Sequence, residues 1–176
     1  TIASLIHGRP DQAEQAVLDL ADMLRSALAY RERITLEAEL ELTRRYLAIE
    51  SLRLGERLRV DWQLDEDLPL DLPTPALLLQ PLVENAIHHG IQRLPEGGTL
   101  TIRIERQPQA LRVTVANPRS ADGAARPGQG IAQHNIRQRL QLAYHAPNPL
   151  EITETPERYQ VAFAIPLEEG GSASLS

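Results

Sequence analysis

The clearest alternation of hydrophobic and polar positions lies in residues 77–90, LLLQPLVENAIHHG. The apolar residues recur at the spacing of one face of an α-helix: Leu79, Leu82, Val83 and Ala86. The other side of this helix carries polar side chains, namely Gln80, Glu84, Asn85, His88 and His89. Gly90 is expected to end the helix, and Pro75 to lie near its first turn. Such a polar patch could hold a hydrated cation, a phosphate group or water alone.

Helical spacing also marks the N-terminal part of the chain. Residues 1–7 and 11–33 flank the turn Gly8-Arg9-Pro10 and predict a helical hairpin, which packs either on a second subunit or on its own domain. Thr35 is a suitable N-cap for a second long helix over 36–54. We expect its buried seam to be Leu36, Leu40, Leu47 and Leu54, and its solvated face to be Arg44, Arg45, Glu50 and Arg53.

The rest of the chain predicts strands in pairs and one more helix. Strands are expected over 58–64, 99–106, 111–116, 150–155 and 159–165, where apolar and polar residues alternate. A helix is expected over 131–144, loops over 65–75 and 117–130, and a disordered tail over 169–176. Strand pairs mixed with helices predict an α+β fold, with one mixed sheet covered by helices on one face.

Composition narrows the possible functions. With one Trp, one Phe and four Tyr, the core must consist mainly of Leu, Ile, Val and Ala. A net charge of −6 argues against nucleic-acid or anionic-membrane binding, which need a basic field. The absence of Cys excludes disulfides and thiolate chemistry. There is no apolar run of membrane-spanning length and no initial Met, so we expect a cytoplasmic fragment of a longer protein.

The candidate chemistry combines three features. Gly128 and Gly130 open the helix over 131–144, where backbone N–H groups can approach an anion. This pattern is neither a Rossmann fingerprint nor a Walker A motif. A flexible loop and Asn85 on a neighbouring helix add a lid and a ligand for Mg²⁺, and Glu84 could orient a water or a hydroxyl. The alternative is that Asn85 only faces solvent. Zinc bound by His88 and His89 is disfavoured, because no third ligand has metal spacing.

These segments resemble sensor histidine kinases of the LytS/YehU type, which share the Bergerat ATP-binding fold. The resemblance rests on residues 77–90 as the N-box, on ITLEAELELTRRYLAIESLRLGERL upstream and on GQGIAQHNIRQRL downstream. It implies a truncated dimerisation hairpin at 1–33 and a Bergerat-type α/β sandwich at 34–168, which binds ATP and Mg²⁺. In the implied site Asn85 ligates Mg²⁺ with Glu84 beside it, residues 118–130 form the ATP lid with Gly128 and Gly130, and further nucleotide contacts come from His88, His89, Asn117, Asn135, Arg137 and Arg139.

Three departures from the family pattern bear on activity. The motif that holds the phospho-accepting His should end just before this chain begins, and His7 lies too late to replace it. Asn117 stands where the family has an Asp that accepts from the adenine amino group. Because it lacks a charge, we expect weaker nucleotide binding. His88 stands where many kinases have Lys, so binding is expected to strengthen as the pH falls toward about 6.5.

The resemblance implies an ATP-dependent protein-histidine kinase. Its partners would be a LytTR-type response regulator and a second copy of the full-length, membrane-anchored protein, with no nucleic acid. One alternative is a degenerate nucleotide-sensing or dimerisation module without transfer activity. Another is an anti-sigma factor kinase of the same fold, against which the long upstream helices argue.

Overall fold

The structure is a computed structural model that describes residues 33–119, 129–146 and 149–167. Residues 1–32 of the predicted hairpin, residues 120–128 of the predicted lid and the tail at 169–176 lie outside the described residues. Gly128 is therefore not described either.

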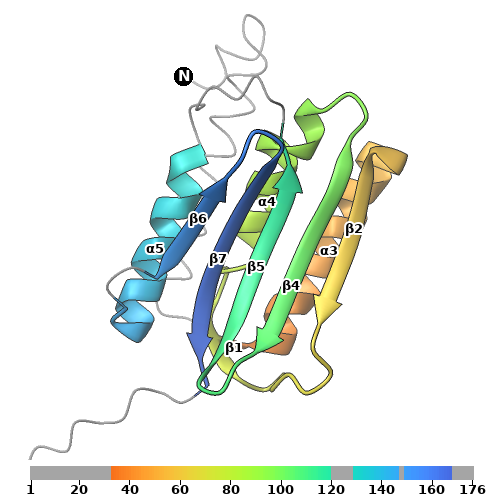
Figure 1. Cartoon of the computed structure of the whole chain (residues 1–176). Coiled ribbons are helices and arrows are strands. Elements are labelled where there is room, and N and C mark those ends of the chain that lie inside the picture. The colour runs from red at the N-terminus through yellow and green to blue at the C-terminus, as the bar shows by residue number, and fades with distance from the viewer. Residues whose placement is uncertain (1–32, 120–128, 147–148, 168–176) are drawn as a thin grey trace, which may run out of the picture.

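A five-stranded mixed sheet forms one layer of the molecule (Figure 1). Across the sheet the order is β2 (Leu58–Leu64), β4 (Gly98–Arg106), β5 (Ala110–Pro118), β7 (Arg158–Pro166) and β6 (Leu150–Glu154). The β2–β4 pair is parallel, and the other three pairs are antiparallel. The predicted mixed sheet is confirmed, with each predicted strand present.

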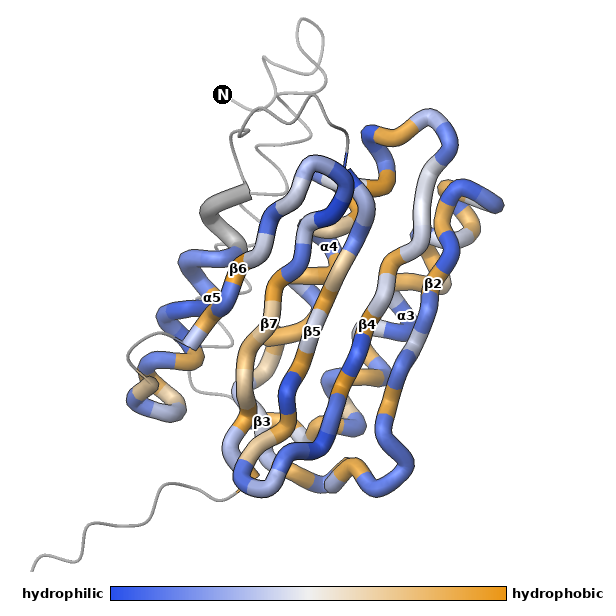
Figure 2. Tube along the Cα trace, in the orientation of Figure 1, coloured by the Kyte–Doolittle hydropathy of each residue, from blue (hydrophilic) through white to orange (hydrophobic). Residues whose placement is uncertain are grey.

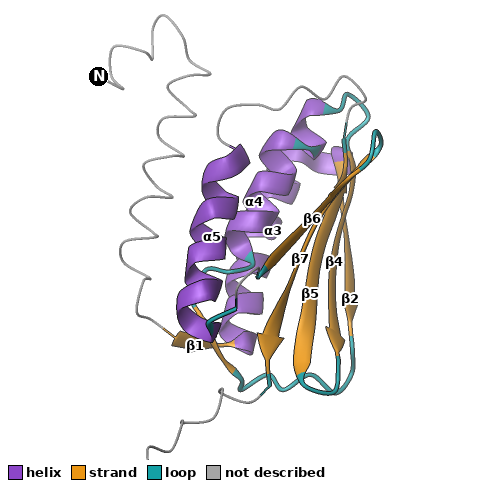
Figure 3. Ribbon diagram, turned by 60° about the vertical axis from the view of Figure 1, so that its left-hand side comes forward, coloured by secondary structure: helices purple, strands orange, loops and turns teal. Residues whose placement is uncertain are grey.

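Three described helices cover one face of this sheet (Figure 3). They are α3 (Leu36–Leu54), α4 (Gln80–His89) and α5 (Gln129–Tyr144), and two short 3₁₀ turns, Gly55–Arg57 and Ile91–Arg93, follow α3 and α4. The α+β class, with helices on one face, is confirmed. Among the described residues, none of the helices combines the length and the apolar character that a membrane span requires.

Alternation of apolar and polar residues along the central strands, most regular in β4, creates the core between the two layers (Figure 2). In β4, Leu100, Ile102 and Ile104 are fully buried toward the helices, whereas Arg103 is exposed on the other face. The core is aliphatic, as predicted: Tyr159 and Phe163 are the buried aromatic residues among those described. Burial of these side chains holds the helices on the sheet.

Helix α3 begins at the predicted N-cap, but its predicted solvated face is partly wrong. The Thr35 hydroxyl accepts from the Ala38 N–H at 3.2 Å, so Thr35 is the N-cap. Leu36, Leu40 and Leu47 are buried, and Leu54 is half-buried. The predicted solvated face is wrong at Glu50, which is 8% exposed. Helical spacing from Leu47 places Glu50 on the buried stripe, and its carboxylate is satisfied there by Arg53 Nε at 3.0 Å. The predicted exposure of Arg44, Arg45 and Arg53 is confirmed.

The segment before α4 differs from the prediction. The expected loop over 65–75 contains a short strand, β3 (Pro73–Pro75), which pairs with β1 (Arg33–Thr35). Pro75 therefore lies in a strand, and α4 begins only at Gln80. Pro81 occupies the first turn, where a missing N–H costs little.

Candidate functional site

A buried carboxylate on α3 fixes the start of α4. The Glu39 side chain is 3% exposed and accepts from the backbone N–H groups of Leu77 at 2.9 Å, Leu79 at 2.7 Å and Gln80 at 3.4 Å. Leu77 has a φ of 59°, a left-handed conformation that few non-glycine residues adopt. The helix therefore cannot extend back through Leu77, and the Glu39 side chain provides the acceptor oxygens that its N-terminus needs.

Arg139 on α5 holds the same segment from the other side. Its guanidinium Nη1 donates to the Ala76 carbonyl at 2.5 Å, and its side chain is 8% exposed. Burial lowers the pKa of Arg139 from its usual value, and the nearby charge of Glu39 opposes that shift. Burial raises the pKa of Glu39, while its bonds to backbone N–H groups lower it. The sequence suggested that Arg139 could reach a triphosphate, whereas the structure gives it this buried contact.

Asn85 lies on the turn of α4 that follows. It is 7% exposed, and its amide forms no hydrogen bond with any described group. Glu84, beside it, is 8% exposed and accepts from Gln80 Nε2 at 2.8 Å. The polar side of α4 is thus more deeply buried than its sequence pattern predicts.

The C-terminal end of α4 contacts the end of β5. A Cβ atom on Gly90 would lie 2.0 Å from Asn117 Nδ2, so this close approach requires glycine. Asn117 is 3% exposed and belongs to β5, which corrects the predicted loop that was to begin at residue 117. Its Nδ2 donates to the Pro118 carbonyl at 2.8 Å, whereas its Oδ1 is buried without a partner. A buried amide oxygen without a partner is therefore held at this end of α4.

The two histidines of α4 are half-buried. His88 Nδ1 lies 3.1 Å from Gln92 Oε1, and an amide oxygen only accepts, so this contact favours a proton on Nδ1. Arg53 Nη2 donates to the same oxygen at 3.2 Å, which links α3 to the 3₁₀ turn after α4.

Helix α5 carries the remaining residues that were predicted to contact the nucleotide. Gly130 lies in its first turn, and Asn135 and Arg137 are half-buried along it. Gln133 Nε2 donates to the Tyr159 hydroxyl, and Tyr159 pairs in register with Asn117 across β5 and β7. Since Gly128 is not described, the prediction that Asn85, Gly128 and Gly130 face one cavity stays a prediction.

The possible metal ligands of this site suit a Mg²⁺ ion that arrives bound to a nucleotide better than a metal ion held by protein side chains alone. No cluster of three or more His, Asp and Glu side chains able to hold a metal occurs within the described parts of the chain. Mg²⁺ commonly takes one or two protein ligands and completes its shell with phosphate oxygens and water. The amide oxygen of Asn85 fits that role, and the Asn117 Oδ1 can accept from an exocyclic amino group such as that of adenine.

Comparison with known proteins relates the chain to histidine kinases. A family profile described as "Histidine kinase" matches residues 1–58. The chain is 32% identical over 184 residues to the sensor histidine kinase YpdA of Escherichia coli, an alignment that covers 98% of this chain and 32% of YpdA. Along nearly its whole length the chain is similar to sensor histidine kinases. It spans about a third of the length of the sensor histidine kinases that it matches.

Solved histidine kinases share the fold. The histidine kinase AdeS of Acinetobacter baumannii superposes with a TM-score of 0.58 at 14% identity, covering 94% of this chain and 83% of AdeS. Full-length ShkA in complex with AMPPNP superposes with a TM-score of 0.56 at 16% identity, covering 92% of this chain and 38% of ShkA. At these identities the likeness is one of fold.

The burial of two carboxylates on α3 was not predicted from the sequence. Glu39 and Glu50 lie on the same helical stripe as the predicted seam of α3, and that position could have marked them as buried. The contact of Gly90 with Asn117 joins residues far apart in the chain, and no local pattern signals it.

Proposed function

We propose that residues 34–168 are the ATP-binding catalytic domain of a sensor histidine kinase. The observation that carries this proposal is the buried, unpartnered Oδ1 of Asn117 at the end of α4, together with the largely buried amide of Asn85 on the same helix. Their positions suit a ligand that brings a metal ion and an amino group. An adenine nucleotide with Mg²⁺ has both, and the relative ShkA binds AMPPNP.

In this proposal the protein supplies positioning and electrostatics for γ-phosphoryl transfer. Asn85 would ligate Mg²⁺, and Glu84 would orient the accepting group. Asn117 would accept from the adenine amino group. Gly128, Gly130 and the lid at 118–130 would enclose the phosphates. Of the two arginines on α5, the half-buried Arg137 suits a phosphate contact better than Arg139, which is bound to Ala76.

The acceptor and the partners are inferred for the longer protein. The phosphoryl group would pass to a His upstream of this chain and then to a response-regulator Asp. We infer a LytTR-type regulator, a homodimer formed through residues 1–33, and a cytoplasmic domain carried by an inner-membrane protein. The motif residues 77–90 and 128–140 support a LytS-type sensor, most like AlgZ (FimS).

A transfer assay tests the function. The chain is incubated with γ-labelled ATP, Mg²⁺ and a separate segment of the longer protein that carries the acceptor His. The proposal expects acid-labile, base-stable phosphate on that segment and none when its His is replaced by Gln. Binding of ATP without transfer would favour the degenerate nucleotide-sensing module, and a lack of ATP binding would contradict both functions.

A further inference from the structure

The face of the sheet opposite the helices is not covered by any described element (Figure 3). On most of this face, arginines lie beside carboxylates. Arg112 pairs with Glu151 at 2.5 Å, and Arg103 Nη1 lies 3.9 Å from Glu105 while its Nε donates to Gln63. In a chain with 24 acidic and 18 basic residues, such pairing is the expected arrangement.

One end of this face is different, because it is hollowed. A pocket of about 510 Å³ lies over the ends of β4 and β5. Its floor is formed by small side chains, among them Gly98, Thr101 and Ala116, where longer side chains cover the rest of the sheet. Its volume lies in the range of small-molecule sites, which is roughly 300–1,000 Å³.

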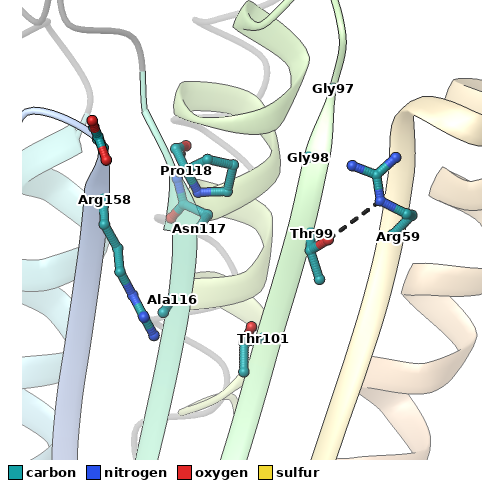
Figure 4. Close-up of a pocket in the computed structure, with 10 residues that line it drawn as sticks. Arg59, Gly97, Gly98, Thr99, Thr101, Ala116, Asn117, Pro118 and Arg158 are labelled. Carbon is teal, nitrogen blue, oxygen red and sulfur yellow. Dashed lines mark hydrogen bonds between the residues drawn. The ribbon is translucent and has the colours of Figure 1, made fainter.

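Two arginines flank the hollow from the neighbouring strands (Figure 4). Arg59 of β2 lies beside Thr99, and its Nε donates to the Thr99 hydroxyl at 3.3 Å. The guanidinium of Arg158 of β7 lies beside Ala116. Within the described part of the chain, neither arginine has a carboxylate within salt-bridge distance, although Glu157 also lines the hollow.

We propose that this hollow is a binding site for a small anion that carries two or more phosphate or carboxylate groups. Two guanidinium groups facing one hollow from different strands can each bind one anionic end, with the Thr99 and Thr101 hydroxyls as further donors. The site does not depend on the proposed kinase activity. Asn117 borders both sites: it lines the hollow, while its side chain amide lies against Gly90 on the helix side of β5.

Titrations followed by NMR test this site. The ¹⁵N-labelled chain is titrated at constant ionic strength with citrate and, separately, with inorganic pyrophosphate, without Mg²⁺ and in the presence of saturating ATP. We expect at least one of them to saturate with a Kd below about 1 mM. The shifts should centre on the Nε–H groups of Arg59 and Arg158 and on the amides of Thr99 and Thr101. The stronger of the two ligands identifies phosphate or carboxylate as the preferred group.

Matched variants decide whether the two arginines form the site. Arg59→Gln and Arg158→Gln should each weaken binding by about tenfold or more, the effect of losing one charge-assisted contact. Arg103→Gln removes the same charge from the same face outside the hollow and should leave binding unchanged. Equal weakening in all three variants, shifts confined to α4 and α5, or a Kd above about 1 mM for both ligands would each overturn the proposal.

Discussion

The two ends of α4 are built differently. At its start every polar group named above has a partner: Glu39 accepts from three backbone N–H groups, and Arg139 donates to Ala76. At its end the Oδ1 of Asn117 is as deeply buried and has no partner, and along the helix the amide of Asn85 forms no hydrogen bond with a described group. Buried polar groups that stabilise a fold are normally satisfied within it, so the unsatisfied ones mark where a ligand is expected.

The largest expected effect is on stability at the start of α4. Glu39→Ala would leave three backbone N–H groups without their acceptor beside the strained Leu77, at an expected cost of about 2–4 kcal/mol. Chemical denaturation with urea measures the loss. Glu41→Ala is the matched control, because Glu41 lies on the same helix in an exposed pair with Arg45 and should cost under about 0.5 kcal/mol. Similar losses in the two variants would contradict the assigned role of Glu39.

At the other end of α4, Gly90→Ala should cost about 1–3 kcal/mol. The added methyl group would lie 2.5 Å from the Ala86 carbonyl oxygen and closer still to the Asn117 amide. The variant should also weaken ATP binding, because Asn117 must move. Gly55→Ala is the control. A Cβ atom at Gly55 would meet no other atom within 4 Å, so only the backbone φ of 57° is unfavourable for alanine. Its unfolding curve should shift without a change in ATP affinity.

A smaller effect is expected on base selectivity. If Asn117 Oδ1 accepts from the adenine amino group, the chain should prefer ATP over GTP, and Asn117→Ala should reduce that preference by about tenfold. Competition titrations with the two nucleotides measure the ratio. A preference that is the same in the variant would show that Asn117 does not contact the base.

The smallest expected effect is a pH dependence of stability. Burial raises the pKa of Glu39 in the folded chain, so folding favours the protonated form. This contribution is complete below the ordinary carboxyl pKa and is lost as the pH rises through the raised value. Relative to Glu39→Gln, the unmodified chain should therefore become less stable as the pH rises above the ordinary carboxyl value of 4.5. Thermal unfolding across that range is the measurement, and the opposite slope would show that the backbone N–H groups outweigh burial.

Much of the fold follows from local sequence patterns. The alternation in β4, β5 and β7 and the Thr35 cap of α3 are local signals, and the structure confirms them. The start of α4 could not be predicted, because it is fixed by Glu39, which lies about forty residues earlier in the sequence. The short strand β3 depends in the same way on the distant β1.

The candidate site was predicted in part. The residue types of α4 marked Asn85 and Glu84, since an amide and a carboxylate on an otherwise apolar helix suggest a ligand. Their depth of burial and the contact between Gly90 and Asn117 depend on how α4 meets β5, which no local pattern records. By its position in the sequence Arg139 was a candidate for binding phosphate. In the folded chain its guanidinium donates to the Ala76 carbonyl, a contact that depends on tertiary packing.

The most direct test is an isothermal titration of the chain with ATP, with and without Mg²⁺, compared with Asn85→Ala. We predict that Mg²⁺ strengthens binding to the unmodified chain by at least about tenfold and to the variant by less than about twofold, because one metal ligand is lost. Affinity without Mg²⁺ and the Tm should change little. An equal gain from Mg²⁺ in both proteins would show that Asn85 does not bind the metal.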